Sequence, residues 1–253
     1  MKVKAKKYLG QHFLIDQTIA ISTAEAISYD IDNIIEVGPG MGMLSQYILK
    51  QPFKNYVAVE IDNESVDYLK INLPELNVIN ADFLKLNLEE IFTGKCSIVG
   101  NFPYNISTQI LFKVFDNRNQ VDELVGMFQH EVAQRIVSKH GNKQYGILSV
   151  LLQAFYDMEY LFKVSNTAFD PPPNVQSAVI KMTRNNVSEL PCNVKLFVQI
   201  VKVGFNQRRK MLHNALKPLC VYNGTFAQKR AEQLSVDDFV LLTNEVERLA
   251  SGF

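Results

Sequence analysis

The tetrapeptide Asn101-Phe102-Pro103-Tyr104 follows a short apolar run, and its residue types suit the holding of a planar amine. The side chain of Asn101 offers a carbonyl acceptor. Pro103 has no N–H, so the backbone around it is rich in carbonyl acceptors, and Tyr104 adds a flat ring beside them. Acceptors next to a stacking ring are what the amino group of a nucleobase needs if it is to be held and made nucleophilic. Taken alone, the same four residues also fit a β-turn with a buried tyrosine.

A glycine-rich turn earlier in the chain indicates a second ligand. Gly38, Gly40 and Gly42 follow the strand expected at residues 34–37 and precede a helical pattern. In that strand–turn–helix context, glycines let the backbone turn tightly and approach a ligand closely. Glu36 stands just before them and places a negative charge near the ligand. The alternative is a tight turn with no ligand, which the same glycines would serve.

Acidic residues end the next two expected strands. Glu60, followed by Ile61, lies 22 residues after Gly38, where a carboxylate accepts hydrogen bonds from ribose hydroxyls. Asp82, followed by Phe83, comes just after a third expected strand and is placed to accept a hydrogen bond from an adenine amine. Each acid alone fits a surface strand end, but their order after the glycines favours a ligand site.

The spacing leaves two ligands open, a dinucleotide and S-adenosylmethionine. The dinucleotide fingerprint is G-x-G-x-x-G, whereas this chain has G-x-G-x-G with Met43 at the last fingerprint position. Glu36 would repel a pyrophosphate and attract a sulfonium or an ammonium. A methylsulfonium is a strong electrophile, so an amine held at residues 101–104 would need no strong base, only positioning and acceptors. Stacking on Tyr104 would add roughly 1–3 kcal/mol, as the gripping of an unstacked base requires.

The elements that must position these residues alternate between strands and helices. Strands are expected at residues 34–37, 56–61, 76–80, 97–99, 122–128, 160–164 and 177–182. Helices are expected at 15–27, 44–49, 65–69, 132–137 and 147–156, and again at 196–203, 208–216, 225–234 and 236–250. This alternation implies an α/β fold with a mostly parallel sheet and helices on both faces, and the last two strands suit an antiparallel edge.

The sequence pattern changes after residue 184, where helical patterns replace the alternation of strands and helices. We therefore expect a first domain at residues 1–187 that contains the sheet. A small all-α domain is expected at residues 188–253.

The composition is that of an ordinary globular protein. Apolar residues make up 47% of the 253 residues. No apolar run approaches the roughly 20 residues that span a bilayer, and the lysine-rich start does not resemble a secretory signal. Cys96, Cys192 and Cys220 show neither metal spacing nor a disulfide framework. We expect a cytoplasmic monomer that binds no metal and no membrane.

Positive charge gathers at the two ends of a chain whose formal net charge is zero. Lys4, Lys6 and Lys7 precede the first acidic residue, Asp16. No acid lies between residues 195 and 217, where the basic residues are Lys195, Lys202, Arg208, Arg209, Lys210 and Lys217. Such ends suit a polyanionic partner, although solvated helix faces have the same composition.

Five motifs in order resemble those of the RNA adenine dimethyltransferases. They are GQHFL at residues 10–14, EVGPGMG at 36–42, NFPYNIS at 101–107, FDPPPNVQSAV at 169–179 and FNQRRK at 205–210. The last two are similar to the branch that acts on small-subunit ribosomal RNA, the KsgA type. The similarity covers nearly the whole chain. One departure is Phe102, where the family more often has Leu, and we expect it to alter packing and not activity.

The resemblance implies a Rossmann-like methyltransferase that uses S-adenosylmethionine. The cofactor-binding residues that it implies are His12, Leu14, Glu36, Gly38, Gly40, Glu60, Ile61, Asp82, Phe83 and Asn101. Asn101, Pro103 and Tyr104 would hold the target amine, and Phe169 would be a second stacking ring, with a buried phenylalanine as the alternative. The residues that would contact RNA phosphates are Lys4, Lys6, Lys7, Arg208, Arg209 and Lys210.

The substrate that the resemblance implies is a pair of adjacent adenines in a hairpin near the 3′ end of small-subunit ribosomal RNA, in an assembling 30S-type particle. Each adenine would receive two methyl groups. The first rival is a large-subunit methylase of the antibiotic-resistance type, against which residues 169–179 and 208–210 argue. The second is an assembly or transcription factor with the same fold, which would not need the intact site. A dehydrogenase is disfavoured by Glu36 and by the missing fingerprint glycine.

Overall fold

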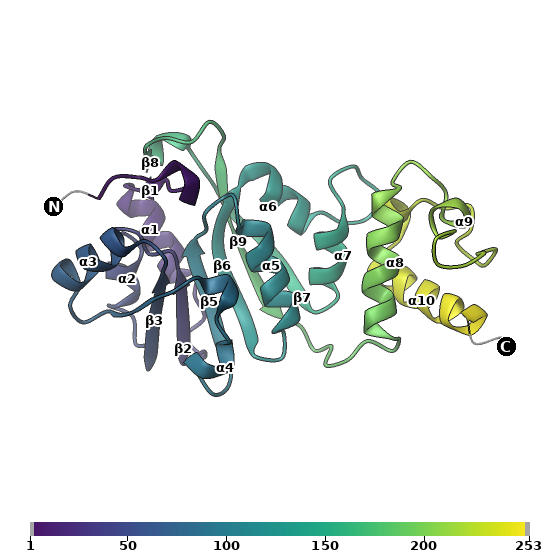
Figure 1. The fold of residues 1–253 in the computed structure, drawn as a ribbon, viewed down its shortest axis with the longest axis horizontal. Coiled ribbons are helices and arrows are strands. Elements are labelled where there is room, and N and C mark those ends of the chain that lie inside the picture. The colour runs from purple at the N-terminus through teal and green to yellow at the C-terminus, as the bar shows by residue number, and fades with distance from the viewer. Residues whose placement is uncertain (1–2, 251–253) are drawn as a thin grey trace. The chain divides into compact units, whose positions relative to one another are not determined.

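The computed structural model describes residues 3–250, and Figure 1 shows their helices and strands. The chain forms two compact units. The first contains the residues up to 133 together with 158–184, and the second contains 134–157 together with the residues from 185 onward. The change at residue 184 lies near the expected boundary at 187. The sequence pattern places residues 134–157 in the first domain, however, and in the structure they belong to the second unit.

A seven-stranded sheet forms the centre of the first unit, in the order β4-β3-β2-β5-β6-β9-β7. Its strands are β2 (Asn33–Val37), β3 (Asn55–Glu60), β4 (Asn77–Asn80), β5 (Cys96–Asn101), β6 (Val121–Gln129), β7 (Tyr156–Val164) and β9 (Ser177–Arg184). All neighbours from β4 to β6 are parallel, and β9 pairs with β6 in the antiparallel sense. The predicted Rossmann-like sheet with an antiparallel edge is confirmed.

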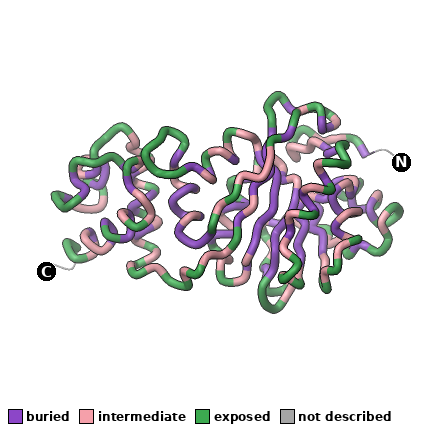
Figure 2. The backbone as a smooth tube through the Cα atoms, turned by 180° about the vertical axis from the view of Figure 1, so that it is seen from behind, coloured by how far each residue is buried: buried purple, intermediate pink, exposed green. Residues whose placement is uncertain are grey.

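The central strands form where the sequence is most continuously apolar. Ile34, Ile98 and Leu124 are completely buried on β2, β5 and β6. Figure 2 shows buried residues running along these strands. Burial on both faces is the rule for parallel strands, whose connecting helices cover the sheet. The sheet therefore presents its ends, and not its faces, to a ligand.

Helices of the first unit connect successive strands. They are α1 (Gln17–Glu25), α2 (Ser45–Ile48), α3 (Asn63–Asn72), α4 (Leu88–Ile91), α5 (Ser107–Asp116) and α6 (His130–Val137), which continues into the second unit. Asp16 and Asp62 cap α1 and α3 by accepting hydrogen bonds from backbone N–H groups of the first turn. The sequence pattern predicts neither α4 nor α5. α5 begins without a capping side chain, so its start carries no local signal.

Two short strands far apart in the sequence form a separate antiparallel sheet. They are β1 (Phe13–Leu14) and β8 (Phe169–Asp170), and Leu14 lies opposite Phe169. Strands of two residues are too short to show an alternating pattern, so the sequence does not predict them. Three 3-10 helices complete this unit: η1 (Lys7–Leu9), η2 (Phe83–Lys85) and η3 (Asn166–Ala168). The small sheet joins the N-terminal segment to the loop before β9.

A buried ion pair links β6 to β9. Glu123 on β6 is completely buried, and its carboxylate lies 2.9 Å from Nζ of Lys181 on β9. The same carboxylate accepts hydrogen bonds from Ser28 N at 3.1 Å and from Ser97 Oγ at 3.0 Å. A buried charge is tolerated when it is paired and its lone pairs are occupied, and both conditions hold here.

The second unit is helical. Its elements are α7 (Ile147–Gln153), α8 (Val194–Asn206), α9 (Leu212–Ala215), η4 (Ala231–Gln233) and α10 (Val236–Ala250). α8 packs against both α7 and α10, which is why residues 134–157 belong to this unit. The ring of Phe239 on α10 lies 6.5 Å from that of Phe197 and 6.0 Å from that of Phe205, both on α8. These aromatic contacts form the core of the unit.

Two predicted helices of this unit are wrong in extent. The pattern at 208–216 yields only α9, and the pattern at 225–234 yields only η4. At the start of the second range, side-chain hydrogen bonds replace those of a helical backbone, because Glu245 accepts from Tyr222 and Thr225. The helix predicted at 147–156 also ends early, at Gln153, because β7 begins at Tyr156.

Neither a membrane span nor a metal cluster is found in the described part of the chain. No helix within residues 3–250 is long and apolar enough to cross a membrane. No three His, Cys, Asp or Glu side chains in that range gather as a metal site would require.

Candidate active site

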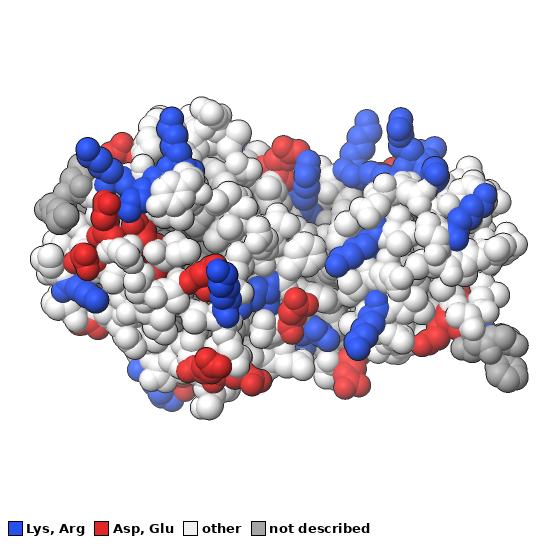
Figure 3. Space-filling model, in the orientation of Figure 1, with Lys and Arg blue, Asp and Glu red and all other residues white. Residues whose placement is uncertain are grey.

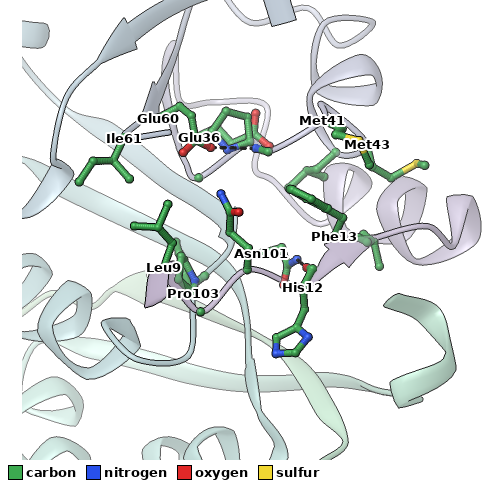
Figure 4. Close-up of a pocket in the computed structure, with 18 of the residues that line it drawn as sticks. Leu9, His12, Phe13, Glu36, Met41, Met43, Glu60, Ile61, Asn101 and Pro103 are labelled. Atoms are coloured by element: carbon green, nitrogen blue, oxygen red, sulfur yellow. Dashed lines mark hydrogen bonds between the residues drawn. The ribbon is translucent and has the colours of Figure 1, made fainter. Parts of the chain in front are cut away.

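A pocket opens at the carboxyl ends of the central strands. β2 lies between β3 and β5, so the strand order reverses there, and ligands of open α/β sheets bind at such a point. The predicted site residues that line the pocket are His12, Leu14, Glu36, Gly38, Gly40, Glu60, Ile61, Asn101, Pro103 and Tyr104. In Figure 4, Glu36 and Glu60 lie on one side of the space, Phe13 and His12 lie on the other, and Asn101 points between them.

The turn after β2 depends on its glycines. The backbone angle φ is +70° at Gly38 and +57° at Gly40, a region that other residues rarely adopt. A Cβ atom at Gly40 would lie 2.9 Å from the ring of Phe13. The N–H of Gly40 donates a hydrogen bond to Glu60 Oε2 at 3.0 Å. The absence of a side chain therefore allows the turn to approach both the N-terminal segment and β3.

Glu60 ends β3 as a nearly buried carboxylate. Its Oε2 accepts from the N–H of Gly40, and its Oε1 accepts from the N–H of Asp62 at 2.9 Å. Burial raises the pKa of Glu60, while these backbone donors act in the opposite direction. Each carboxylate oxygen has a second lone pair, so the group can still accept hydrogen bonds from hydroxyl groups of a ligand. Ile61, half-exposed, forms the rim beside it.

Glu36 is a second buried carboxyl group, with 1% of its surface exposed. Its Oε2 accepts hydrogen bonds from Ser45 Oγ at 2.6 Å and from the hydroxyl of Tyr56. Burial raises the pKa of Glu36 to about 7, and repulsion from Glu60 adds to this, although the two donors oppose it. The group is therefore only partly ionised near neutral pH, and a cation in the pocket would favour its charged form.

The side chain of Asn101 is oriented by the N-terminal segment. Its Nδ2 donates a hydrogen bond to the carbonyl of His12 at 3.0 Å. With the amide held this way, Oδ1 is the atom that remains as an acceptor, and no described residue donates to it. Figure 4 shows the amide projecting into the open space. An unpaired acceptor in a pocket is the group that an amine donor requires.

Pro103 and Tyr104 complete this wall of the pocket. The carbonyl of Pro103 accepts one hydrogen bond, from Ile106 N at 3.1 Å, and keeps a second lone pair. The hydroxyl of Tyr104 bonds to Ser177 Oγ, and burial raises the pKa of Tyr104. Its ring centre lies 5.5 Å from that of His12, with the two planes tilted by 30°. The tyrosine is thus fixed at its hydroxyl while its ring borders the pocket.

Phe102 also lines the pocket, and its ring packs into the core. Its ring is 1% exposed and lies 5.1 Å from that of Phe128. A Cβ atom at Gly126 would lie only 2.0 Å from this ring, so the glycine on β6 makes room for it. The large residue between Asn101 and Pro103 is therefore accommodated by packing, and the expectation that Phe102 leaves activity intact stays a prediction.

Three predicted site residues do not line the pocket. Asp82 caps η2, where its Oδ1 accepts from Leu84 N at 3.0 Å. Phe83 is buried beneath the ammonium group of Lys113, which lies 5.4 Å from the ring centre. Phe169 is 2% exposed, because its pairing opposite Leu14 in the small sheet places it in the hydrophobic core. The structure thus places the ring of Phe169 in the core, and its role as a second stacking ring stays a prediction.

The predicted RNA-contacting residues fall into two groups. Lys6 pairs with Asp62, and Arg208 Nε lies 2.7 Å from Glu232 Oε2 while its NH2 group donates to two backbone carbonyls. These two side chains are engaged within the protein, which the sequence does not reveal. Lys4, Lys7, Arg209 and Lys210 are exposed. Figure 3 shows lysine and arginine side chains gathered at the upper edge of the second unit.

Several pocket residues are absent from the sequence-based prediction. They are Leu9, Gly10, Gln11, Phe13, Pro39, Met41, Met43, Leu44 and Phe102. Most of them belong to the GQHFL and EVGPGMG motifs, so membership of these motifs is the sequence feature that could have identified them as pocket residues. Phe102 belongs to the NFPYNIS motif, whereas Leu9, Met43 and Leu44 lie outside the motifs and have no distinguishing chemistry.

Comparison with protein families gives a match along nearly the whole chain. The model described as "Ribosomal RNA adenine dimethylase" matches residues 2–249. A protein of Cytophaga hutchinsonii named "Ribosomal RNA small subunit methyltransferase A" is 55% identical over 251 residues, covering 96% of this chain and 97% of its own. A protein of Flavobacterium johnsoniae with the same name is 52% identical and covers 97% of both chains.

Solved structures show the same fold. A dimethyladenosine transferase from Plasmodium falciparum superimposes with a TM-score of 0.79 at 24% identity, covering 96% of this chain and 99% of its own. The 23S rRNA methyltransferase ErmE gives a TM-score of 0.69 at 21% identity, covering 92% of this chain and 99% of its own. The similarity therefore extends over both units of the fold.

Proposed function

Since the chain belongs to the ribosomal RNA adenine dimethylase family, we propose that it methylates small-subunit ribosomal RNA at two adjacent adenines in a hairpin near the 3′ end. Each N6 amine receives two methyl groups from S-adenosylmethionine. The enzyme acts as a cytoplasmic monomer on an assembling 30S-type particle. The observation that carries the proposal is the free Oδ1 of Asn101, which faces the same pocket as the two buried carboxyl groups.

The residues of the pocket fit the methyl donor. Glu60, with both oxygens already fixed by backbone donors, accepts hydrogen bonds from the ribose hydroxyls. Glu36 supplies a buried negative charge that favours a cationic ligand over a pyrophosphate. Gly38 and Gly40 have no side chains, and this leaves room for the ligand at the end of β2. S-adenosylmethionine, when bound, supplies an electrophilic methyl group, so no residue has to act as a strong base.

The residues at the end of β5 hold the target amine. Oδ1 of Asn101 and the carbonyl of Pro103 each accept one N–H, which draws the amine towards tetrahedral geometry and frees its lone pair. The ring of Tyr104 stacks on the base. Phe169 is not required in this scheme, because its ring is buried. Asp82 and Phe83 remain proposed contacts of the adenine end of the cofactor.

The second unit supplies phosphate contacts for the RNA. We expect Arg209→Ala combined with Lys210→Ala to reduce the salt slope of RNA binding by roughly 1.5–2. Both side chains are exposed and free to release counterions. Filter binding at several salt concentrations measures the slope. Lys50→Ala with Lys70→Ala, two exposed lysines of the first unit, is the matched control, and an equal reduction there would contradict a specific role.

Glu36→Gln should raise the stability of the ligand-free protein at alkaline pH. The pKa of Glu36 is about 7 in the folded protein against 4.5 ordinarily. Below about pH 4.5 the group is protonated in both states and has no effect. As the pH rises towards 7 the unfolded chain ionises first, so the free energy of unfolding falls. Gln does not titrate, so the pH-dependent difference between the melting temperatures of the two proteins should vanish near pH 4 and favour the variant at pH 8.

Glu36→Gln should weaken cofactor binding, although it stabilises the ligand-free protein. The affinity of the wild-type protein for S-adenosylmethionine should rise with pH through about 7, because the cation favours ionised Glu36. The Gln variant should bind about tenfold more weakly at pH 8, equivalent to ~1.4 kcal/mol, and show no such rise. Calorimetry at pH 6, 7 and 8 measures this. Glu75→Gln, on the surface, is the control.

Methylation of small ribosomal subunits that lack the modification tests the function as a whole. Incubation with the purified protein and labelled S-adenosylmethionine should place label on the small-subunit RNA, and mapping should locate dimethyladenine at two adjacent positions near the 3′ end. Label confined to large-subunit RNA would favour the antibiotic-resistance type of methylase. Tight binding of RNA without transfer would favour a non-catalytic assembly factor.

A further inference from the structure

Residues 6–14, here called the N-terminal strap, form one wall of the pocket. Six residues of the strap, 9–14, line it. The strap is anchored at its end by β1, which pairs with β8, and by the side chain of His12, whose Nδ1 donates to the carbonyl of Pro171 at 2.8 Å. The carbonyl of His12 accepts the hydrogen bond from Asn101 described above. The conformation of the strap therefore determines the direction of the Asn101 amide.

The beginning of the strap is fastened to the residues after β3. Nζ of Lys6 pairs with Asp62 and lies 3.1 Å from Glu64 Oε1. Gln11 Nε2 donates to Asp62 Oδ2 at 3.2 Å, and Gln11 Oε1 accepts from the backbone N–H of Lys6 at 2.9 Å. The Asp62 side chain is 1% exposed and that of Lys6 is 23% exposed. We call the set Lys6, Gln11 and Asp62 the clasp.

The electrostatics of the clasp favour the pairing of Lys6 with Asp62. The hydrogen bond and charge of Asp62 raise the pKa of Lys6. At Asp62 burial acts to raise the pKa, but hydrogen bonds from Lys6, Gln11 and Ser65 outweigh it and hold the pKa below its ordinary value. Both groups are thus fully charged at neutral pH. A lysine bound in this way is not a free phosphate ligand.

The clasp also adjoins the carboxylate that we assign to the ribose. The backbone N–H of Asp62 donates to Glu60 Oε1, and the side chain of Asp62 caps α3, so its position is fixed from two directions. Glu60 in turn holds the glycine turn through Gly40. The beginning of the strap therefore contacts Asp62, on the cofactor side of the site. Its end contacts Asn101, on the amine side.

We propose that Lys6 and Asp62 are positioning residues for the transfer reaction: they fasten the strap over the cofactor and, through the carbonyl of His12, keep the Asn101 amide oriented towards the target amine. This assignment rests on the proposed function. It replaces the expectation that Lys6 contacts RNA. If the strap were only a wall of the cofactor pocket, loosening it would change cofactor affinity alone. The clasp affects both cofactor affinity and the rate of transfer at saturating cofactor.

The test is Lys6→Met, with Lys7→Met as its matched control. Lys7 is the next residue, carries the same charge, and is exposed. We expect Lys6→Met to weaken S-adenosylmethionine binding in calorimetry by roughly 5- to 10-fold, and to lower kcat on unmethylated small subunits by a similar factor. Lys7→Met should leave the cofactor affinity unchanged, and Lys6→Arg, which keeps the charge, should stay within about twofold of the wild-type affinity.

A double variant tests the pairing itself. Asp62→Asn should weaken cofactor binding as Lys6→Met does, and the double variant should be no weaker than the worse single variant, because both substitutions open one contact. Asp62 also caps α3, so melting temperatures accompany these measurements. If Asp62→Asn unfolds the protein, the comparison of Lys6→Met with Lys6→Arg still decides.

Each outcome separates the clasp from the function on which it rests. A wild-type protein that binds no S-adenosylmethionine would contradict the proposed function itself. If the wild type binds it and Lys6→Met matches the wild type in both affinity and kcat, the clasp is wrong. A shallower salt slope of RNA binding in Lys6→Met, with unchanged cofactor affinity, would show that Lys6 is an RNA contact and would overturn the inference.

Discussion

Replacing Asn101 by alanine should lower the rate of methyl transfer by roughly 100- to 1,000-fold, the range seen when one preorganised polar group of an active site is removed. The substitution takes away the acceptor Oδ1 while leaving both buried carboxyl groups in place. Cofactor affinity should therefore change only a few-fold. Single-turnover methylation of unmodified small subunits measures the rate, and calorimetry measures the affinity.

Two further variants make this result specific. Asn101→Asp keeps an acceptor but replaces the donor to His12 by an oxygen, so its rate should lie between those of the wild type and the alanine variant. Asn72→Ala, on the exposed part of α3, removes a local side-chain hydrogen bond to Tyr68 O within the helix and should leave the rate unchanged. Wild-type transfer by Asn101→Ala would refute the amine-holding role.

The second large effect is expected on stability. Glu123→Ala should lower the free energy of unfolding by about 3–5 kcal/mol, because it removes a completely buried carboxylate and leaves Lys181, whose side chain is only 20% exposed, without its counter-ion. It also removes the acceptor used by Ser28 and Ser97. Denaturant unfolding measures the change. Replacing both members of the pair, as in Glu123→Met with Lys181→Met, should cost less than the sum of the two single substitutions.

The neighbouring residue provides the control. Asp122 on β6 also pairs with a lysine, since the Nζ of Lys95, just before β5, lies 2.6 Å from its carboxylate, but Lys95 is 55% exposed. Exposed ion pairs contribute about 0–1 kcal/mol, so Asp122→Ala should have a small effect. Equal losses for Asp122→Ala and Glu123→Ala would mean that burial does not govern the contribution of the pair.

The central sheet could be predicted from the sequence because its strands carry their signal locally. The runs at residues 34–37 and 97–99 are mostly apolar, broken only by Glu36 and Ser97, and they form β2 and β5 with nearly the expected bounds. The helices near the C-terminus were harder. At residues 225–234 the apolar spacing suits a helix, but Glu245, far along the chain, binds Thr225 and Tyr222 and holds the backbone otherwise.

The same distinction applies to the site. Asn101, Pro103 and Tyr104 are consecutive, so their joint chemistry can be read from the chain. The partner of Lys6 cannot, because Asp62 is brought to it only by folding, and a lysine in a basic segment looks like a phosphate contact. Phe169 illustrates the converse case. Its motif suggests an accessible ring, but the unpredicted pairing with Leu14 buries it.

If Asn101 and Pro103 hold the target amine as we propose, their two carbonyl oxygens also set the point at which the reaction stops. An unmodified amine has two N–H groups, one for Oδ1 of Asn101 and one for the carbonyl of Pro103. Each transferred methyl group replaces one of these hydrogens, so a dimethylated amine has no donor left. Pro103 still has its bond to Ile106, but Asn101 then faces the product without any partner for Oδ1. The finished base is consequently the species that this pocket holds least well, and its departure follows from the loss of its hydrogens.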